Sequence, residues 1–396
     1  MSATQAAPSA DRPVRGPGPR ILVVEGALRD NGGLRVSHDL ARRWQAAGAR
    51  VRVLVLETVA PTVPLLQPDP GLDVRFASRK VRRFRTAVVP VVVGALRHAR
   101  RADVVVSGSE IGYNLLVGWA AARVTRTPFV VLVQNSLPRA VADWTPAALR
   151  PLLSAVHRRV DAAVCVSPGL VEEVRRTGLP ADRIHTAAIG IDVEATLQRV
   201  RDAGGPVRSA SGRTRLVAAG RLAEQKGFDV LLDAVARVVA AGRDVELVLV
   251  GAGPLREVLA RQVAELGLGE RVELAGHVAD PQPLLAGADL FVLSSRYEGN
   301  GSLVLLEALA HGVPVVATDC PTGPRYVLRD GEVGDLVPVE DPQALADAVL
   351  RHLDDPEPLR RKARLGPARA RDFDQGPAAE EVARVLRSVR RRGRRG

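Results

Sequence analysis

Cysteine and aromatic residues are scarce in this 396-residue chain, and their scarcity argues against two classes of protein. Only Cys165 and Cys320 occur, and each stands in or beside an apolar run, far from the other in sequence. Two isolated cysteines are typical of buried thiols in a reducing compartment and not of a disulfide framework. Aromatic residues make up 3% of the chain, which disfavours a protein that stacks nucleic-acid bases on a sheet.

Long hydrophobic runs are also absent. The longest apolar stretch, residues 87–96, contains Pro90 and is shorter than the ~20 residues of a bilayer-spanning helix. Residues 1–19 are rich in Ala, Pro, Gly and Ser but lack the hydrophobic segment of a signal peptide, so we expect a disordered lead-in. We therefore expect a cytoplasmic protein that contacts a membrane, if at all, only at its periphery.

Positive charge, in contrast, is in excess. The chain has 56 Lys and Arg against 44 Asp and Glu, for a net charge of +12. This balance favours a partner that carries phosphate, such as a nucleotide, a nucleic acid or an anionic membrane. The alternative is a chain that is simply rich in arginine, and net charge alone does not separate the two interpretations.

Apolar runs of strand length alternate with helical patterns along the whole chain, which predicts parallel sheets built from βαβ units. The expected strands are residues 21–24, 51–56, 103–106, 129–133 and 162–166 in the first half, and 216–219, 245–250, 290–293 and 313–317 in the second. We predict an α/β protein with two Rossmann-like, doubly wound parallel-sheet domains that face a cleft, where ligands bind at the carboxyl ends of the strands. In the first domain we expect a loop through Gly32 and Gly33 before the first helix.

The domain boundaries follow from composition. Residues 206–213 belong to a stretch rich in Gly, Pro and Ser, which predicts a linker between a domain at 20–205 and a second at 214–376. Residues 377–396 have a helical apolar stripe and a basic tail. We expect this last helix to cross back to the first domain.

Two cations five positions apart mark a candidate phosphate site. Arg221 and Lys226 follow the expected strand 216–219 and precede a helical pattern. At such a turn, free backbone N–H groups and the helix dipole favour an anion. A phosphorylated ligand is the natural partner of this pair.

A second candidate segment, residues 294–309, carries two glutamates. Glu298 lies in a Gly-rich loop, and Ser302 is positioned to cap the following helix with its hydroxyl. Glu307 stands on that helix among apolar residues, where a carboxylate needs donors such as vicinal sugar hydroxyls. The alternative is a structural glutamate bonded to backbone amides or to an arginine.

Neither a nicotinamide cofactor nor a metal is expected. The turn Gly251-Ala252-Gly253 has Arg256 where a dinucleotide fingerprint has its third glycine. The Asp-x-Asp sequence at 372–374 precedes the last helix and suits helix capping better than metal binding. The histidines lack the spacing of a zinc site.

Together these segments resemble glycosyltransferase family 4 (glycosyl transferases group 1), retaining enzymes with the two-domain GT-B fold. Four motifs fall in the order of the family and are strongest over residues 220–335. They are Gly220-Arg221-Leu222 with Gln225-Lys226-Gly227, Val250-Gly251-Ala252-Gly253-Pro254-Leu255, Glu298-Gly299 with Glu307-Ala308-Leu309, and Gly312-Val313-Pro314-Val315-Val316-Ala317-Thr318-Asp319.

The resemblance implies a role for each segment. Arg221 and Lys226 would hold the diphosphate of a nucleotide sugar and stabilise its charge as the sugar leaves, without a metal ion. Glu298 would bind hydroxyls of the transferred sugar, and Glu307 those of the ribose. The remaining donor-binding residues would be Gly32 and Gly33 near the phosphate, Gly253, His277 and Val278 near the base, and Gly299, Asn300, Gly301, Ser302 and Leu303 along the sugar and phosphate.

The chain departs from the family in two places within this site. Eight residues separate Glu298 from Glu307 where the family has seven, so an extra residue must bulge in the loop. Gln134 and Asn135 replace a histidine found in many relatives after the strand that ends at Val133. We expect one of these two amides to contact the sugar or the acceptor in its place.

The expected reaction is transfer of a hexose or N-acetylhexosamine from a nucleoside diphosphate sugar, with UDP favoured, to a glycan, lipid-linked or small-molecule acceptor. Retention of anomeric configuration is implied by the family. Two alternatives stay open: a sugar-nucleotide epimerase or phosphorylase on the same fold, and a basic nucleic-acid-associated protein. The second is disfavoured because we find neither a helix-turn-helix nor an aromatic RNA-binding motif.

A basic segment in the expected acceptor domain has two interpretations. Residues 79–85 contain five Lys and Arg and precede the helix from Ala87, which ends in Arg97, Arg100 and Arg101. The segment could seat the protein on anionic lipid, close to a lipid-linked acceptor. The alternative, which we favour from the sequence alone, is a solvated basic loop.

Overall fold

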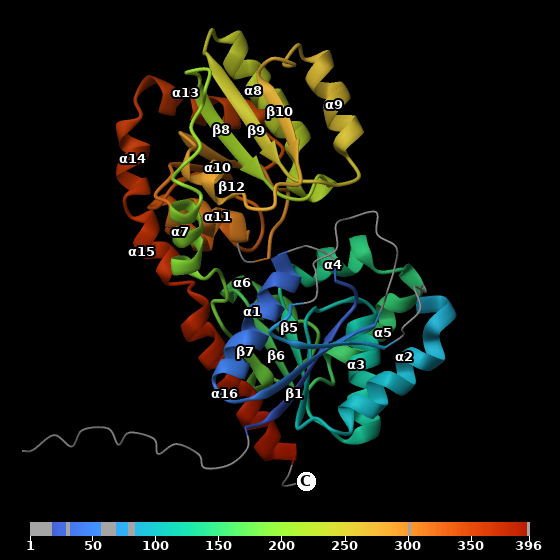
Figure 1. The fold of residues 1–396 in the computed structure, drawn as a ribbon. Coiled ribbons are helices and arrows are strands. Elements are labelled where there is room, and N and C mark those ends of the chain that lie inside the picture. Colours follow the sequence, from blue (N-terminus) through green and yellow to red (C-terminus); the bar gives the residue numbers. More distant parts are fainter. Residues whose placement is uncertain (1–17, 29–31, 57–68, 78–83, 300–301, 394–396) are drawn as a thin grey trace, which may run out of the picture.

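The computed structural model describes residues 18–28, 32–56, 69–77, 84–299 and 302–393, which form two parallel sheets covered by helices (Figure 1). The first sheet has the order β3-β2-β1-β4-β5-β6-β7. Its strands are β1 (Arg20–Glu25), β2 (Arg50–Val55), β3 (Asp73–Phe76), β4 (Val104–Ser107), β5 (Phe129–Val133), β6 (Ala162–Cys165) and β7 (Ile184–Thr186). Its helices are α1 (Gly32–Ala46), α2 (Phe84–Ala99), α3 (Gly112–Thr125), α4 (Leu137–Trp144), α5 (Arg150–His157) and α6 (Pro168–Arg175).

The second sheet repeats the same winding, with the order β10-β9-β8-β11-β12-β13. Its strands are β8 (Thr214–Ala219), β9 (Val245–Val250), β10 (Val272–Gly276), β11 (Leu290–Leu293), β12 (Val315–Thr318) and β13 (Asp335–Val337). The helices around it are α7 (Val193–Asp202), α8 (Phe228–Ala240), α9 (Arg256–Glu265), α10 (Gln282–Ala286), α11 (Leu303–Ala310), α12 (Pro324–Val327), α13 (Pro342–Asp354), α14 (Glu357–Ala363) and α15 (Gly366–Arg371). All pairings in both sheets are parallel, so the predicted fold is confirmed.

The near-continuous apolar character of the central strands explains this architecture. Every residue of β5 and of β11 is buried, because helices cover both faces of each sheet. One apolar core surrounds the first sheet, and two cores lie on the two faces of the second. We call the elements around these sheets the first and second units.

The chain passes between the units at two points that lie side by side. The first crossing lies between Ile189, in the core of the first unit, and Ile191, in the core of the second unit. The second crossing follows Phe373, which also belongs to the core of the second unit. Ile191 pairs with Asp374, and the Gln375 N–H donates to the Ile191 carbonyl oxygen at 3.1 Å. A Cβ atom on Gly190 would overlap the backbone of Phe373, so only glycine fits at this crossing.

Helix α16 (Gln375–Gly393) runs from the second crossing along the first unit (Figure 1). Its apolar stripe joins the first core through Ala378, Ala379, Val382, Val385, Leu386 and Val389. Helix α7 packs instead against α10 and α11 of the second unit, although it precedes the predicted boundary at residue 205. Within the predicted linker, the Val207 N–H donates to the Pro283 carbonyl oxygen at 2.8 Å.

The structure differs from the sequence predictions at the start of α1. Gly32 and Gly33 are the first residues of this helix and not a loop before it. The predicted lead-in falls mostly on residues 1–17, and the basic segment mostly on 78–83, both outside the described residues. In the described part of the chain, no helix has both the length and the apolar character needed to cross a membrane.

Candidate functional site

Four loops meet at the carboxyl edge of the second sheet. The loops after β8 and β9 are bonded together, because the Leu222 N–H donates to the Ala252 carbonyl oxygen at 3.0 Å. A Cβ atom on Gly253 would overlap the backbone of Leu222, which explains the requirement for glycine there. The Gly251 N–H in turn donates to the Gly276 carbonyl oxygen at 2.8 Å. The predicted diphosphate and base segments are therefore neighbours.

The strand-to-helix turn after β8 holds both predicted cations. Arg221 is exposed, and Lys226 ends a short 3-10 helix, η3 (Glu224–Lys226). Gly227 follows with φ 58°, and a Cβ there would overlap the Ser294 carbonyl oxygen. This close contact joins the turn to the loop after β11.

Lys226 forms an ion pair with Glu298, the predicted sugar-binding carboxylate. Both side chains are largely buried, at 13% and 6% exposed. The Ser295 hydroxyl also donates to Glu298 Oε1 at 2.6 Å, and the Thr322 hydroxyl donates to the Glu298 carbonyl oxygen. The structure thus brings together two of the three predicted catalytic residues.

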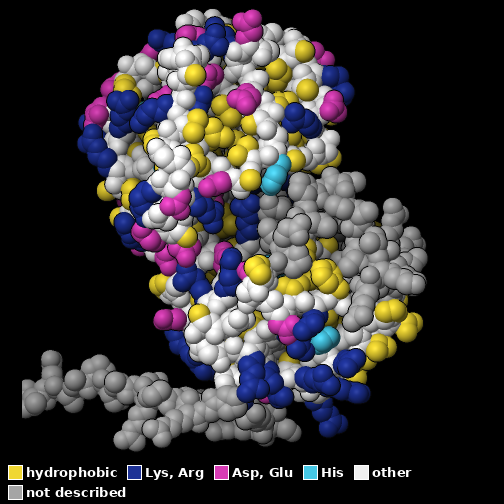
Figure 2. Space-filling model, viewed as in Figure 1, with side chains coloured by type: hydrophobic (Ala, Val, Ile, Leu, Met, Phe, Trp, Pro, Cys, Tyr) yellow, Lys and Arg dark blue, Asp and Glu magenta, His cyan; other side chains and the backbone are white. Residues whose placement is uncertain are grey.

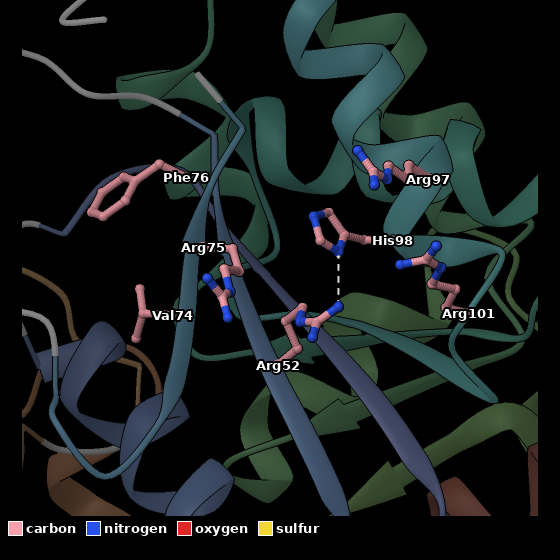
Figure 3. Close-up of a pocket in the computed structure, with 7 residues that line it drawn as sticks. All are labelled: Arg52, Val74, Arg75, Phe76, Arg97, His98 and Arg101. Carbon is pink, nitrogen blue, oxygen red and sulfur yellow. Dashed lines mark hydrogen bonds between the residues drawn. The ribbon is translucent and has the colours of Figure 1, made fainter. Parts of the chain in front are cut away.

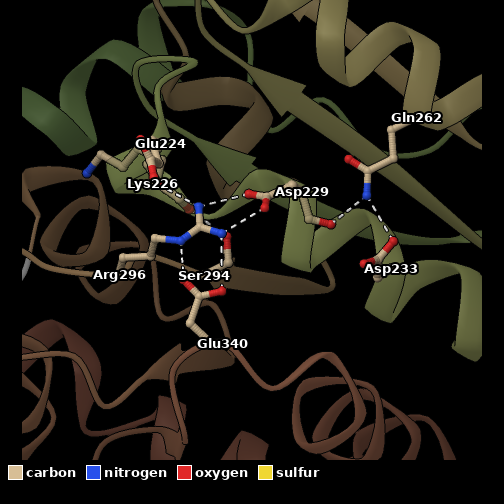
Figure 4. A network of polar contacts seen from close by, with 8 residues as sticks. All are labelled: Glu224, Lys226, Asp229, Asp233, Gln262, Ser294, Arg296 and Glu340. Atoms are coloured by element: carbon tan, nitrogen blue, oxygen red, sulfur yellow. Dashed lines mark hydrogen bonds and ion pairs between the residues drawn. The ribbon is translucent and has the colours of Figure 1, made fainter.

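Arg296, which the sequence analysis did not single out, connects the two loops (Figure 4). Its guanidinium donates to both Asp229 carboxylate oxygens, at 2.9 and 2.7 Å, and pairs with Glu340. Burial acts to raise the pKa of Asp229, but pairing with Arg296 outweighs it and the pKa lies below its ordinary value. The hydrogen bonds to Asp229 likewise raise the pKa of Arg296. Both groups stay charged and fix the loop that carries Glu298.

The first unit meets this loop directly. A Cβ atom on Gly299 would overlap the Gln134 carbonyl oxygen, and the Ser167 hydroxyl donates to the Gly299 carbonyl oxygen at 3.1 Å. Gln134 and Ser167 follow β5 and β6, just as Gly299 follows β11. The carboxyl edges of the two sheets therefore face each other.

The two amides that replace the family histidine are held by structural hydrogen bonds. Gln134 Nε2 donates to the carbonyl oxygens of Gly108 at 2.7 Å and Gly33 at 3.2 Å. Asn135 Nδ2 donates to Glu110 Oε1 at 2.9 Å. Burial raises the pKa of the Glu110 carboxyl, another residue that the sequence analysis missed.

Glu307 lies on α11 where α1 and α7 approach. Burial raises the pKa of its carboxyl, while Gln282 and the charges of Arg35 and Arg199 act in the opposite direction. Arg35 belongs to α1 of the first unit, so groups of both units face this carboxylate. Burial also lowers the pKa of His311, next to Gln282, to about 4.

The start of α11 differs from the prediction. Ser302 is the N-cap residue, but its side chain makes no capping hydrogen bond, and its backbone has φ 72°. This left-handed backbone is incompatible with the extended conformation from which a serine caps a helix. Leu303 contacts the Gly32 position, where a Cβ would lie 3.2 Å from Leu303 Cδ1. Asn300 and Gly301, and the predicted bulge with them, lie outside the described residues.

Two of the three predicted base contacts lie after β10, and the third, Gly253, follows β9. His277 is exposed, and Val278 packs partly against the core of the second unit. No cluster of three or more potential metal ligands occurs within the ranges that the structure describes. In the Asp-x-Asp sequence, Asp372 pairs with Arg329 and Arg369, and Asp374 accepts the Gly376 N–H at 2.8 Å at the start of α16.

Glu25 is a further buried carboxyl that the sequence analysis missed. It ends β1 at the edge facing the second unit, and the Ser37 hydroxyl donates to it at 2.5 Å. Burial raises its pKa to about 7. A Cβ atom at position 108 would overlap the Glu25 carboxyl. Glycine at this position therefore leaves the space that the carboxyl occupies.

Comparison with known families matches both units. Residues 31–190 match the glycosyl transferase 4-like domain, and residues 213–355 match glycosyl transferases group 1. The chain is 30% identical over 390 residues to the alpha-D-kanosaminyltransferase of Streptomyces kanamyceticus, covering 86% of this chain and 98% of that protein. It is 31% identical over 368 residues to the phosphatidyl-myo-inositol mannosyltransferase of Mycobacterium leprae, covering 89% and 91%.

Solved structures share the fold at lower identity. The chain resembles Anabaena HepE in complex with UDP-glucose with a TM-score of 0.76 and 20% identity, over 93% of this chain and all of that one. It resembles sucrose-phosphate synthase from Thermosynechococcus elongatus with a TM-score of 0.76 and 20% identity, over 94% and 99% of the two chains.

Proposed function

The chain belongs to the group 1 glycosyltransferases, and on that premise we propose that it transfers a hexose or N-acetylhexosamine from a nucleoside diphosphate sugar. The observation that carries the proposal is the Lys226–Glu298 ion pair, with Arg221 on the same turn and the first unit against Gly299. UDP is the favoured nucleotide, supported by the UDP-glucose bound to the HepE structure. The proposed acceptor is a glycan, a lipid-linked sugar or a small molecule.

Arg221 and Lys226 would act on the diphosphate. The bond between the anomeric carbon and the diphosphate oxygen breaks, and both electrons of that bond go to the diphosphate. Cations fixed near that oxygen stabilise the developing charge because the protein has already oriented them. We propose that no metal ion is required, since these two side chains supply the positive charge.

Retention requires that the acceptor oxygen bond to the anomeric carbon on the face that the diphosphate leaves. The acceptor hydroxyl then loses its proton to the departing diphosphate oxygen, which balances the step without a separate protein base. In this proposal Glu298 accepts hydrogen bonds from sugar hydroxyls while it holds Lys226 in place. Glu307 accepts those of the ribose, and Gly299 to Leu303 line the sugar and phosphate.

The first unit would complete the site. Gly32 and Gly33, at the start of α1, present backbone N–H groups of a helix N-terminus to the phosphate. Gln134 uses both N–H groups of its side-chain amide and Asn135 uses one, so either side-chain oxygen could accept a hydrogen bond from a sugar hydroxyl. Closure of the units around the donor excludes water and positions the acceptor.

We also propose that the protein works in the cytoplasm, in peripheral contact with an anionic membrane. Cys165 and Cys320 are buried free thiols, as a reducing compartment permits. Helix α2 exposes Val88, Val89 and Val93 beside Arg97 and Arg100, a pattern suited to an anionic lipid surface. Co-sedimentation tests this contact: binding to anionic but not neutral vesicles supports it, and equal binding or none contradicts it.

A thermal-shift screen with UDP, GDP, ADP and a DNA duplex tests the function. A bound ligand stabilises the folded state, so selective stabilisation by UDP supports the proposal and stabilisation by DNA alone contradicts it. Product analysis with a UDP-sugar then separates the alternatives on this fold. An epimerase converts the donor without an acceptor, and a phosphorylase requires phosphate, whereas transfer requires an acceptor and releases UDP.

A further inference from the structure

A cationic cavity of about 530 Å³ lies in the first unit, apart from the donor site (Figure 3). It is lined by Arg52, Val74, Arg75, Phe76, Arg97, His98 and Arg101. Arg52 lies in the first half of β2. Arg97, His98 and Arg101 lie at the C-terminal end of α2 or just after it, before the start of β4. The predicted donor segments follow the carboxyl ends of other strands. None of the residues that line the cavity belongs to these segments.

Positive charge in this cavity is only partly balanced. Asp73 binds two of the arginines, with its oxygens 2.6 Å from Arg52 Nη2 and 2.6 Å from Arg75 Nε. Arg97 and Arg101 have no carboxylate partner among the residues that the structure describes. Four guanidinium groups therefore face one carboxylate. In Figure 2 a group of Lys and Arg side chains gathers on the same lower unit.

His98 shows the effect of this charge and adds a donor. Burial lowers its pKa most, Arg52, Arg97 and Arg101 lower it further, and Asp73 opposes them. The lowered pKa favours the neutral form of the imidazole. Its Nδ1 lies 3.2 Å from Arg52 Nη1 and accepts from that guanidinium, which leaves the proton on Nε2.

These groups define the chemistry of a ligand. Guanidinium groups are donors only, and their forked geometry suits the oxygens of a phosphate. Asp73 pairs with Arg52 and Arg75 and so does not balance the charges of Arg97 and Arg101. The two negative charges of a phosphomonoester would neutralise these two arginines. Val74 and Phe76 border the cavity on β3, but their side chains point away from His98 (Figure 3), so the chemistry of the cavity is set by its arginines and His98. The cavity volume lies in the range of small-molecule sites, about 300–1,000 Å³.

We propose that this cavity binds the phosphomonoester group of a ligand other than the donor nucleotide, held by Arg97, Arg101 and His98. Such a group can come from a soluble phosphorylated molecule or from a lipid headgroup. The shared chemistry is a terminal phosphate with two negative charges. The proposal does not depend on the glycosyl-transfer reaction, because none of the lining residues belongs to the donor site.

The test uses the full chain and the double variant Arg97→Gln with Arg101→Gln. The matched control, Arg123→Gln with Arg261→Gln, removes two exposed arginines elsewhere on the surface. Inorganic phosphate is titrated while the His98 imidazole is followed by NMR. We expect phosphate to raise the pKa of His98 in the wild type and in the control. In the double variant we expect affinity at least about tenfold weaker, the effect of losing one charge-assisted hydrogen bond.

Vesicles distinguish the two sources of phosphate. Phosphatidic acid carries a phosphomonoester and phosphatidylglycerol a phosphodiester, so both types of vesicle are compared at equal surface charge. A preference for phosphatidic acid that the double variant loses assigns the cavity to a lipid headgroup. Phosphate binding without that preference assigns it to a soluble ligand. The double variant and the control variant should show the same urea unfolding midpoint, which confirms that the double variant folds.

The proposal is overturned by either of two results. One is phosphate binding of equal strength in the wild type and the double variant. The other is the absence of any His98 response to phosphate together with equal binding to the two kinds of anionic vesicle.

Discussion

The Lys226 ammonium group and the Glu298 carboxylate form an ion pair between the loops that follow β8 and β11. In the proposed function Lys226 contacts the diphosphate and Glu298 contacts the sugar, so this ion pair would join the two ends of the donor site. The Ser295 hydroxyl fills a further hydrogen-bonding position of the carboxylate. A substitution at either residue is therefore expected to displace the other.

Glu298→Gln should lower kcat about 10²-fold, the scale of losing one oriented group at a charged transition state. Glu246→Gln is the matched control, since Glu246 pairs with Arg215 at the other end of the same sheet with similar burial. We expect both variants to lose about 1–3 kcal/mol of unfolding free energy, and only Glu298→Gln to lose activity. Equal kcat in the two variants would show that Glu298 is structural.

Arg296→Lys should lower kcat/KM because a lysine cannot make the two parallel hydrogen bonds to Asp229. Arg271→Lys is the control, at an ion pair with Asp244 remote from the site. Activity and urea unfolding are measured on both. If Arg296→Lys is destabilised no more than the control and retains full activity, the guanidinium does not position the Glu298 loop.

Gly299→Ala should weaken activity by separating the units, because its Cβ would overlap the Gln134 carbonyl oxygen. Gly269→Ala is the matched control, since no atom lies within 4 Å of its Cβ position. Small-angle scattering and the transfer rate are measured for each. An unchanged radius of gyration and rate for Gly299→Ala would contradict the close contact.

Glu25 should make folding stability fall as pH rises. An ordinary glutamate has a pKa of 4.5, whereas burial raises the pKa of Glu25 in the folded protein to about 7. Between pH 4.5 and pH 7 the folded state therefore retains a proton that the unfolded state releases. Stability declines across this window by about 3 kcal/mol and then levels off. Urea unfolding of the wild type and Glu25→Gln as a function of pH checks this. Parallel pH profiles would contradict it.

Glu307 should make nucleotide affinity fall as pH is lowered. Burial raises its pKa, so the carboxylate becomes protonated at a higher pH than an ordinary glutamate and then accepts fewer ribose hydrogen bonds. Calorimetry with UDP on the wild type and Glu307→Gln separates this effect from titration of UDP itself. The variant should bind more weakly at neutral pH, and the difference should narrow as pH falls. A difference that is constant with pH would argue against the ribose contact.

The central strands were predictable from sequence, and the strands at the sheet edges were not. The predicted strands include β1, β5, β9 and β11. The central residues of these strands are apolar because helices cover both faces of each sheet. The missed strands β3, β7, β10 and β13 are the four edges of the two sheets. Edge strands are partly exposed and carry polar residues such as Asp73 and Arg75, so they lack a continuous apolar signal.

The family and the fold were predictable because the motifs are local in sequence, and both are confirmed. The residues that support the site were not, because their role depends on partners distant in sequence. Arg296 acquires its role from Asp229, 67 positions away, and Asn135 from Glu110, 25 positions away. The donor, the acceptor, retention and the roles of the site residues stay predictions.

The most direct test of the account is calorimetry with UDP on the wild type and on the double variant Arg221→Ala with Lys226→Ala. The account predicts that the wild type binds UDP and that the double variant binds at least about 100-fold more weakly, since two cations no longer contact the diphosphate. A double variant that binds UDP as tightly as the wild type and retains full transfer activity would contradict the assignment of these two residues to the diphosphate.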